Sequence, residues 1–294
     1  MAATEAAAVA LGEDRRATYA VVGDGEPLLM FPGGPGDSAA YLAPQAALAG
    51  ERFRCFLLDP HGSGGSTPPI SDGDYSPEGH ARFYDEVRCA LGLERISVYG
   101  HSFGGGVALT YSALYPEVVD RCVCVSGFGV GADVDEGDAA AEMERALVRY
   151  EDASWYAEAR IVSDEWTDRV LAAESSGEVD DMMRTVVPFY FAHPERPEIS
   201  RVIDEYRRTL NFDLRAVKAW EGGLYQRVDL RPLLGRIRCR TLVVAGELDF
   251  ICGPAQARPI ADGISGAELV VVPDRGHFPA EEAPDAFREA LARV

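Results

Sequence analysis

The stretch ISVYGHSFGGGVA, residues 96–108, decides how this chain folds around its chemistry. A run of β-forming residues enters a Gly-x-Ser-x-Gly pattern, and a helical pattern follows at once. A turn this sharp from strand to helix leaves no room for side chains beside the serine, and Gly100 and Gly104 remove them. The glycine run continues to Gly106 and allows the helix to pack closely. Ser102 is therefore predicted to stand at the carboxyl edge of a sheet, beneath a helix dipole that favours negative charge.

Short apolar runs alternate with helical patterns along much of the chain, and this alternation predicts a largely parallel sheet flanked by helices. The expected strands cover residues 17–22, 27–31, 53–58, 95–99, 121–126, 240–245 and 268–272. The expected helices cover residues 76–91, 103–115, 254–262 and 280–292.

The alternation stops near residue 128 and resumes near residue 229. The interval contains no convincing strand, and it predicts amphipathic helices over residues 138–150, 153–173, 178–192 and 198–221. We therefore expect one core formed by residues 1–127 and 229–294, with residues 128–228 inserted as a helical cap.

The net charge is strongly negative and unevenly distributed. The 294 residues include 28 basic and 48 acidic side chains, a formal charge of −20. This balance argues against binding to nucleic-acid phosphates or to anionic membranes. Residues 131–225, which make up most of the inserted segment, contain 22 acidic and 11 basic side chains and so carry −11 of the total. Such a cap favours the approach of cationic substrates.

Hydropathy and cysteine usage argue against a membrane-spanning, secreted or disulfide-stabilised protein. No stretch approaches about twenty uninterrupted apolar residues, so no membrane span is expected. The first sixteen residues lack the apolar run of a signal peptide, and we expect a cytoplasmic protein. Six cysteines are too sparse for a disulfide scaffold, and the spacing of Cys122 and Cys124 suits neither zinc nor a redox pair. No metal or cofactor is expected.

A serine hydroxyl is a weak nucleophile at neutral pH and needs a histidine base that a carboxylate orients. Asp249 ends the strand pattern TLVVAGELD, and Glu247 is the alternative acid in the same stretch. His277 follows the strand pattern ELVVVP and is the predicted base. The remaining histidines are explained by a position beside the serine, in a glycine-rich loop or in helical segments; they are His101, His61, His80 and His193.

Acyl transfer also requires two backbone N–H groups aimed at the developing oxyanion. One belongs to Phe103, which follows the proposed nucleophile. The other is expected from the stretch MFPGGPG, residues 30–36, which follows an early strand. Gly34 is the predicted second donor, and Gly33 is the alternative.

These residues resemble the α/β-hydrolase superfamily and, within it, the proline iminopeptidase-like group of serine aminopeptidases. The motifs that carry the resemblance are GGPG at 33–36, DPHGSGGS at 59–66, the serine turn at 100–105, GELD at 246–249 and GH at 276–277. The resemblance covers residues 17–127 and 229–294. It implies the α/β-hydrolase fold with a helical cap over the site, and it assigns nucleophile, acid and base to Ser102, Asp249 and His277.

The sequence departs from the group's usual motifs at several positions. Pro32 stands where the group usually has histidine before GGPG, and His61 stands where it usually has arginine. Phe103 occupies a position that is often Trp or Tyr. Phe250 follows the predicted catalytic aspartate, where some relatives have an acid. These departures concern the substrate rather than the chemistry.

The resemblance also implies how a substrate would be held. The group binds the free α-amino group of its substrate through acidic residues, largely from the cap, and Glu205 and Glu221 are candidates here. We therefore expect a cofactor-independent serine hydrolase acting on a small molecule or short peptide, with aminopeptidase activity first. An esterase, lactonase or amide hydrolase is the alternative, and a non-catalytic ligand-binding homologue is the third hypothesis.

Overall fold

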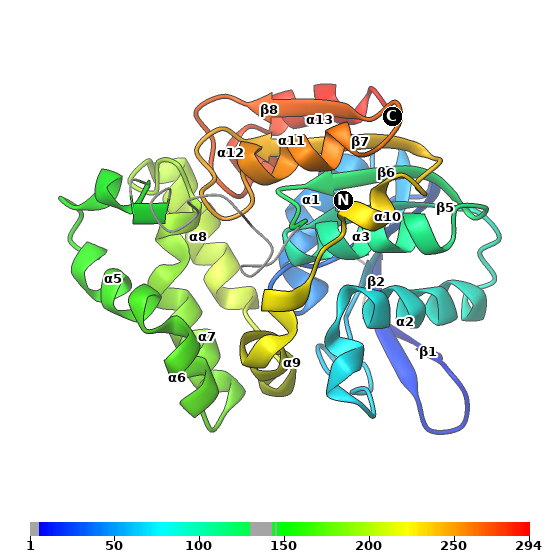
Figure 1. Ribbon diagram of the computed structural model, residues 1–294, viewed down its shortest axis with the longest axis horizontal. Coiled ribbons are helices and arrows are strands. Elements are labelled where there is room, and N and C mark those ends of the chain that lie inside the picture. The colour runs from blue at the N-terminus through cyan, green and yellow to red at the C-terminus, as the bar shows by residue number, and fades with distance from the viewer. Residues whose placement is uncertain (1–5, 130–142, 145) are drawn as a thin grey trace.

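The computed structural model describes residues 6–129, 143–144 and 146–294. Within this part, the strands form one eight-stranded sheet in the order β1-β2-β4-β3-β5-β6-β7-β8 (Figure 1). The strands are β1 (Ala7–Ala10), β2 (Arg16–Val22), β3 (Glu26–Phe31), β4 (Phe53–Leu58), β5 (Ile96–His101), β6 (Val119–Val125), β7 (Arg240–Gly246) and β8 (Glu268–Val272).

The sheet is parallel from β4 to β8 and antiparallel at one edge, where β2 pairs with β4 and with β1. The α/β-hydrolase fold with a mostly parallel sheet is therefore confirmed. Every predicted strand is present, with ends that shift by at most two residues. Strand β1 was not predicted from the sequence, because its four residues are mostly alanine and give little β signal.

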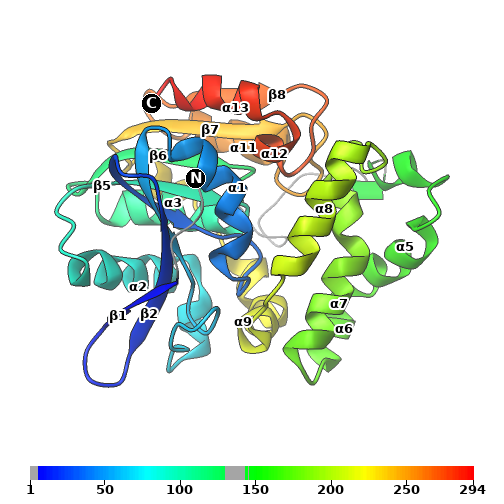
Figure 2. The ribbon, with the colours of Figure 1, turned by 180° about the vertical axis from the view of Figure 1, so that it is seen from behind.

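Alternate residues of the central strands pack into two separate hydrophobic clusters. In β3, Leu28 and Met30 belong to one cluster, whereas Leu29 and Phe31 belong to the other. This alternation follows from the two-residue period of a strand with both faces covered. Helices α2, α3 and α11 lie toward the viewer in Figure 1, and α1 and α13 lie toward the viewer in the reverse view of Figure 2.

The helices that cover the sheet are α1 (Ala43–Ala49), α2 (Pro77–Ala90), α3 (Phe103–Leu114), α10 (Arg231–Leu234), α11 (Pro254–Asp262), α12 (Pro279–Glu282) and α13 (Pro284–Leu291). Helices α2, α3 and α11 follow the predicted ranges to within one residue, whereas α1 and α10 were not predicted. The prediction of a single helix over 280–292 is wrong. Pro284 disfavours helical geometry at Ala283, which has φ −147° and ψ 65°, and the segment divides there.

Within the described residues, the segment expected to form the cap, called the cap below, contains more and shorter helices than the sequence predicts. They are α5 (Tyr156–Asp164), α6 (Trp166–Ala172), α7 (Ser176–Val186), α8 (Pro197–Thr209) and α9 (Leu214–Ala219). The expected helix 153–173 divides at Glu165, and the helix expected over 178–192 ends at Val186 before a short 3₁₀ turn. Of the thirteen residues in the expected helix 138–150, six lie outside the described residues, and its described end forms a 3₁₀ turn over Val148–Tyr150.

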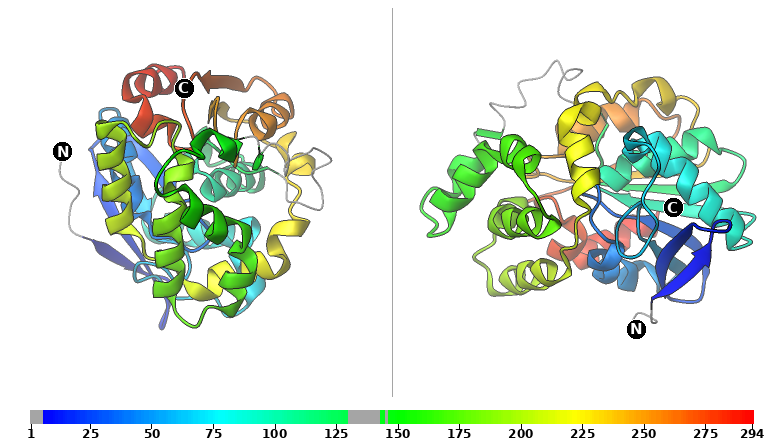
Figure 3. Two further views of the ribbon diagram at one scale, coloured as in Figure 1. Left: turned by 90° about the vertical axis from the view of Figure 1, so that its left-hand side faces the viewer. Right: turned by 90° about the horizontal axis from the view of Figure 1, so that it is seen from below.

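The expected helix 198–221 also divides, and here the reason is clear. Residues 210–213 leave the helical path and contact the core, where the Asp213 N–H donates to the Gly36 carbonyl at 2.9 Å. The Asp213 side chain then caps α9 by accepting from Ala216 N–H at 2.7 Å. Figure 3 (left) shows the cap helices in front of the core. No described helix combines the length and apolar content needed to cross a bilayer.

Candidate active site

The serine turn has the strained backbone that its sequence predicts. Ser102 lies between β5 and α3 with φ 57° and ψ −124°, a conformation that residues with side chains rarely adopt. A Cβ atom on Gly100 would overlap the carbonyl oxygen of Gly104, and one on Gly104 would overlap that of Phe31. The glycines are therefore required by the close approach of three backbone segments.

His277 and Asp249 form a buried pair at the same edge of the sheet. His277 Nδ1 lies 2.9 Å from Asp249 Oδ2, and both side chains are almost fully buried. Asp249 Oδ1 accepts from the N–H groups of Ile251 at 2.9 Å and Cys252 at 3.1 Å. Burial opposes ionisation of Asp249, but the charge and hydrogen bond of His277 and these two N–H groups outweigh it and lower its pKa. Asp249 is thus held as a carboxylate facing the imidazole.

The backbone of His277 is held from two sides. Its N–H donates to the Tyr190 carbonyl of the cap at 2.7 Å. Its carbonyl oxygen lies 2.9 Å from His101 Nε2, on the residue that precedes Ser102. The loop bearing His277 therefore adjoins the serine turn. Glu247, the alternative acid, instead accepts from the Asp274 N–H at 3.0 Å.

The other histidines occupy different surroundings. His61 packs on Phe83 with ring centroids 4.0 Å apart, and burial lowers its pKa. His80 is fully buried in α2, where burial lowers its pKa to about 3. His193 is on the cap and pairs with Asp274 at 2.7 Å. The His193–Asp274 pair is exposed and uses Nε2, whereas His277 binds its buried carboxylate through Nδ1.

The glycine loop after β3 lies directly against the serine turn. A Cβ on Gly33 would stand 2.6 Å from the Cβ of Ser102. The Gly33 N–H donates to the hydroxyl of Tyr41. Gly34 has φ +50° and belongs to the same loop, and within the described residues no hydrogen bond engages its N–H. Phe103 begins α3, where the first N–H groups have no partner inside the helix.

The cap contacts this glycine loop through the segment that divides α8 from α9. The Phe212 ring lies so close to Gly34 that a Cβ there would approach it to 2.8 Å. Asp37 Oδ1 accepts from the N–H groups of Ser38 at 2.8 Å and Asn211 at 3.2 Å, and Tyr206 donates to Oδ2 at 3.3 Å. Burial raises the pKa of Asp37 to about 8 despite the opposing effect of these N–H groups.

Aromatic rings of the cap and core surround the two predicted catalytic loops. Trp220 packs on Phe103 with ring centroids 4.8 Å apart, and Tyr190 packs on His277 at 5.4 Å. Of the two acids predicted to bind an amine, Glu205 is exposed on α8. Glu221 is partly buried, and it accepts from the Trp166 indole at 3.1 Å and the Thr167 hydroxyl at 2.7 Å.

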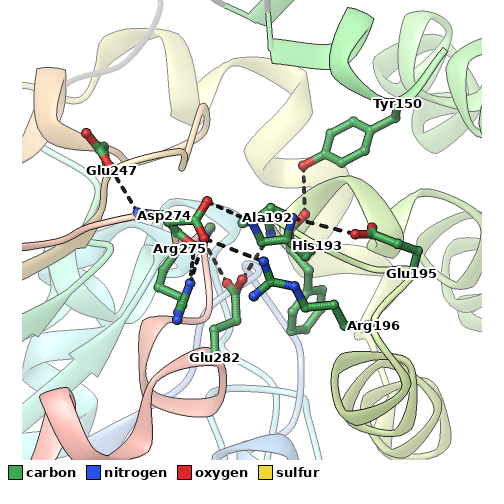
Figure 4. A network of polar contacts seen from close by, with 11 residues as sticks. Tyr150, Ala192, His193, Glu195, Arg196, Glu247, Asp274, Arg275 and Glu282 are labelled. Atoms are coloured by element: carbon green, nitrogen blue, oxygen red, sulfur yellow. Dashed lines mark hydrogen bonds and ion pairs between the residues drawn. The ribbon is translucent and has the colours of Figure 1, made fainter. Parts of the chain in front are cut away.

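A second set of cap contacts holds the loop that carries His277 (Figure 4). Glu282 accepts from the Gly276 N–H at 2.9 Å and from the Ala192 N–H of the cap at 3.0 Å. Burial raises the pKa of Glu282 to about 7. Nearer the surface, His193 and Arg196 of the cap pair with Asp274 at 2.7 and 3.7 Å. The base loop and the cap segment 190–196 therefore form one connected unit.

Several residues that shape the site were missed in the sequence. They are Tyr41, Asp37, Tyr206 and Glu282, and no local pattern singles them out, because their partners lie far along the chain. The residues described by the structure contain no group of three or more histidine, cysteine or acidic side chains placed to hold a metal ion. The residues placed at this edge supply a hydroxyl, an imidazole, a carboxylate and backbone N–H groups.

Comparison with known proteins places the chain in a family. The model of the alpha/beta hydrolase fold family matches residues 26–284, so the chain belongs to that family. Proline iminopeptidase from Saccharolobus solfataricus is 26% identical over 284 residues, which cover 93% of this chain and 86% of that protein. Lipase 1 from Psychrobacter immobilis is 26% identical over 299 residues, which cover 98% of this chain and 85% of that protein.

Solved structures agree on the fold. An alpha/beta fold family hydrolase from Bacillus anthracis has a TM-score of 0.77 at 18% identity, covering 99% of both chains. The enol-lactonase from Burkholderia xenovorans has a TM-score of 0.70 at 21% identity, covering 97% of this chain and 98% of that one. Family membership supports hydrolase activity. The resemblance to the proline iminopeptidase-like group rests on a distant relative, and relatives with different names share the same fold.

Proposed function

We propose that this chain is a serine hydrolase that cleaves a carboxylic ester, lactone or amide through an acyl-enzyme on Ser102. The observation that carries the proposal is the buried contact between His277 and Asp249, 2.9 Å apart. The loop that bears His277 also contacts His101, the residue before Ser102. A carboxylate at Nδ1 fixes the imidazole tautomer that leaves Nε2 unprotonated as a base. The strained turn exposes the hydroxyl at the same edge.

In the proposed reaction, His277 Nε2 takes the hydroxyl proton as Ser102 Oγ attacks the substrate carbonyl carbon. The N–H groups of Gly34 and Phe103 stabilise the oxyanion, since the Gly33 N–H already donates to Tyr41. The imidazolium gives its proton to the leaving alcohol or amine. Water then attacks the acyl-enzyme and passes a proton to His277. The bond between the acyl carbon and Ser102 Oγ breaks, Oγ takes that proton back from the imidazolium, and the acid leaves, while Asp249 stabilises the charged imidazole.

A substitution of the nucleophile tests this proposal. Ser102→Ala should lower kcat by about four to six orders of magnitude and abolish labelling by a fluorophosphonate probe, with unchanged thermal unfolding. Ser126→Ala is the matched control, because Ser126 is another strand-end serine with positive φ, at 44°, and is fully buried. Turnover or labelling of Ser102→Ala at the wild-type level would contradict the assignment.

The acids near the site favour a substrate without a free amine. Glu221 already accepts from Trp166 and Thr167, and Glu205 is exposed. The raised pKa of Asp37, about 8, keeps that carboxyl largely protonated at neutral pH. The rings of Trp220 and Tyr190 pack on Phe103 and His277 and add apolar surface beside them. These surroundings suit a neutral acyl group, so we place ester, lactone and amide hydrolysis ahead of aminopeptidase activity.

Aminopeptidase activity is the second candidate. A proline iminopeptidase is 26% identical over 93% of this chain, and Glu221 directly follows Trp220, which packs on Phe103. Proline β-naphthylamide, its N-acetyl form and p-nitrophenyl acetate separate the two candidates. Preference for the ester and indifference to N-acetylation would support our order. A loss of cleavage on N-acetylation of about a hundredfold, itself abolished in Glu221→Gln, would reverse it.

A further inference from the structure

A buried chain of hydrogen bonds runs past the serine turn, and the mechanism above does not use it. The Gly33 N–H donates to the Tyr41 hydroxyl. That hydroxyl lies 3.0 Å from His101 Nδ1, and His101 Nε2 lies 2.9 Å from the carbonyl oxygen of His277. Tyr41 and His101 are 5% and 2% exposed, so water does not compete for these contacts.

The two ends of this chain fix the direction of every bond in it. The His277 carbonyl can only accept, so His101 Nε2 must carry a proton and donate. The Gly33 N–H can only donate, so the Tyr41 oxygen accepts it and its own proton points to His101 Nδ1. His101 is therefore neutral, in agreement with the burial that lowers its pKa to about 3. Protonating His101 would place two donors on the Tyr41 oxygen and leave its own hydrogen without an acceptor in the chain.

We propose that Tyr41 and His101 are positioning residues. By joining Gly33 to the backbone of His277, they fix the position of the glycine loop relative to the loop that carries His277. The proposal rests on the proposed function, because it assigns those loops to oxyanion binding and to proton transfer. Neither residue touches the reacting atoms. Each acts through the backbone group that it holds.

Packing around the glycine loop shows why its position depends on these hydrogen bonds. A Cβ on Gly33 would meet the Cβ of Ser102 at 2.6 Å and the Tyr41 hydroxyl at 2.9 Å, so the loop already touches both. Because Tyr41 takes the Gly33 N–H, the next donor along the loop is Gly34. The ring of Phe278 packs on His101 at 4.8 Å and on Tyr41 at 6.2 Å. In such apolar surroundings a lost hydrogen bond leaves a buried polar group without a partner.

The chain of hydrogen bonds from Gly33 through Tyr41 and His101 to His277, called the relay below, can be observed directly, without any assay of activity. Nitrogen-15 NMR of wild-type protein labelled at histidine should show His101 at pH 7 as a neutral imidazole with the proton on Nε2, with His101→Gln identifying the signal. A proton on Nδ1, or a charged ring, would overturn the relay. This measurement does not depend on whether the chain hydrolyses anything.

Kinetics then test the positioning role. Tyr41→Phe should lower kcat for p-nitrophenyl acetate by about ten- to a hundredfold, with KM changed less than about threefold. The oxygen of an ester uses oxyanion donors better than the sulfur of the matching thionoester. The rate ratio of ester to thionoester should therefore also fall about tenfold in Tyr41→Phe. A purely structural role would lower both rates equally and leave that ratio unchanged, which would overturn the proposal.

Matched variants separate this effect from the loss of any buried hydrogen bond. Tyr111→Phe removes an equally buried hydroxyl, which donates to Asp85 at 2.8 Å on the opposite side of the sheet, and it should keep both the rate and the ratio. His101→Gln can donate and accept as the imidazole does, so it should retain at least about tenfold more activity than His101→Leu. Equal activity in the two His101 variants would contradict the relay. An inactive wild type with the predicted tautomer would instead contradict the proposed function alone.

Discussion

The serine turn and the cap contacts hold the same site by different physical means. In the core, Gly100 and Gly104 allow carbonyl oxygens and backbone to approach so closely that no side chain fits. At the boundary with the cap, the core residues Glu282 and Asp37 accept from the backbone N–H groups of Ala192 and Asn211 in the cap. The first kind of contact depends on volume alone. The second depends on the protonation of carboxyl groups.

Because of this difference, we expect the serine turn to respond to added side-chain volume and the cap contacts to respond to pH. Close backbone packing resists pH and fails abruptly when a methyl group is added. Buried carboxyls with raised pKa values change charge near neutral pH, and the strength of their contacts changes with them. The proposed catalytic residues thus depend on close packing in the core, whereas the position of the cap depends on the protonation of ionisable groups.

The largest effect is expected from the acid of the core. Asp249→Asn should lower kcat by about ten thousandfold, because the amide no longer stabilises the imidazolium or selects its tautomer. Glu247→Gln, two residues earlier, should change kcat by less than about tenfold, since Glu247 binds the Asp274 N–H instead. Steady-state kinetics on one ester measure both. The opposite order would transfer the role of the acid to Glu247.

Adding a methyl group to a glycine sharpens the contrast between core and cap. Gly100→Ala should destabilise the protein by about 3 kcal/mol, because the new Cβ overlaps the Gly104 carbonyl. Gly222→Ala in the cap meets nothing closer than Leu171 Cδ2 at 3.9 Å and should change stability by less than about 0.5 kcal/mol. Urea unfolding followed by circular dichroism measures both. Similar losses of unfolding free energy in the two variants would contradict the expected difference between core and cap.

The pH dependence of stability tests the link between cap and glycine loop. Asp37 titrates near its usual 3.8 when unfolded and at about 8 when folded, so between those values the folded state holds a proton that the unfolded chain has lost. Stability from this group therefore falls as pH rises toward 8. Asp37→Asn has no proton to lose. The free energy of unfolding of wild type relative to this variant should drop by about 2 kcal/mol from pH 6 to pH 8.

Urea unfolding at several pH values checks this prediction. The free-energy difference between wild type and Asp37→Asn should become constant above about pH 9, where both states are ionised. A difference that does not change between pH 6 and pH 8 would show that the Asp37 contacts carry no such linkage.

The smallest effect is expected at the exposed end of the cap contacts. His193→Ala removes the partner of Asp274, a solvent-exposed pair, and should lower the Tm by about 2 °C or less with kcat/KM within about twofold of wild type. Glu282→Gln is the comparison, because its single acceptor oxygen cannot serve both N–H groups. It should lower the Tm by clearly more, as measured by thermal unfolding. Equal shifts would mean that burial does not distinguish the two contacts.

Prediction from sequence succeeded where the signal is local. The strands were located because both faces of the sheet are covered and their apolar runs are continuous. The serine turn was located because only glycine fits beside Ser102. The cap helices were predicted less well. The helices break at Glu165 and at residues 210–213, although the sequence pattern on either side predicts one continuous helix.

Local patterns were enough to predict the fold, the serine turn and the candidate partners Asp249 and His277, because each depends on residues that are neighbours along the chain or on strand ends that share an edge. The contact between His277 and Asp249, and the hydrogen bond that already engages the Gly33 N–H, are seen only in the folded structure. Only the structure, too, joined Asp37 to Asn211 and Glu282 to Ala192, pairs separated by 174 and 90 residues. Such pairs leave no periodic trace, since each is a single hydrogen bond between segments that folding brings together.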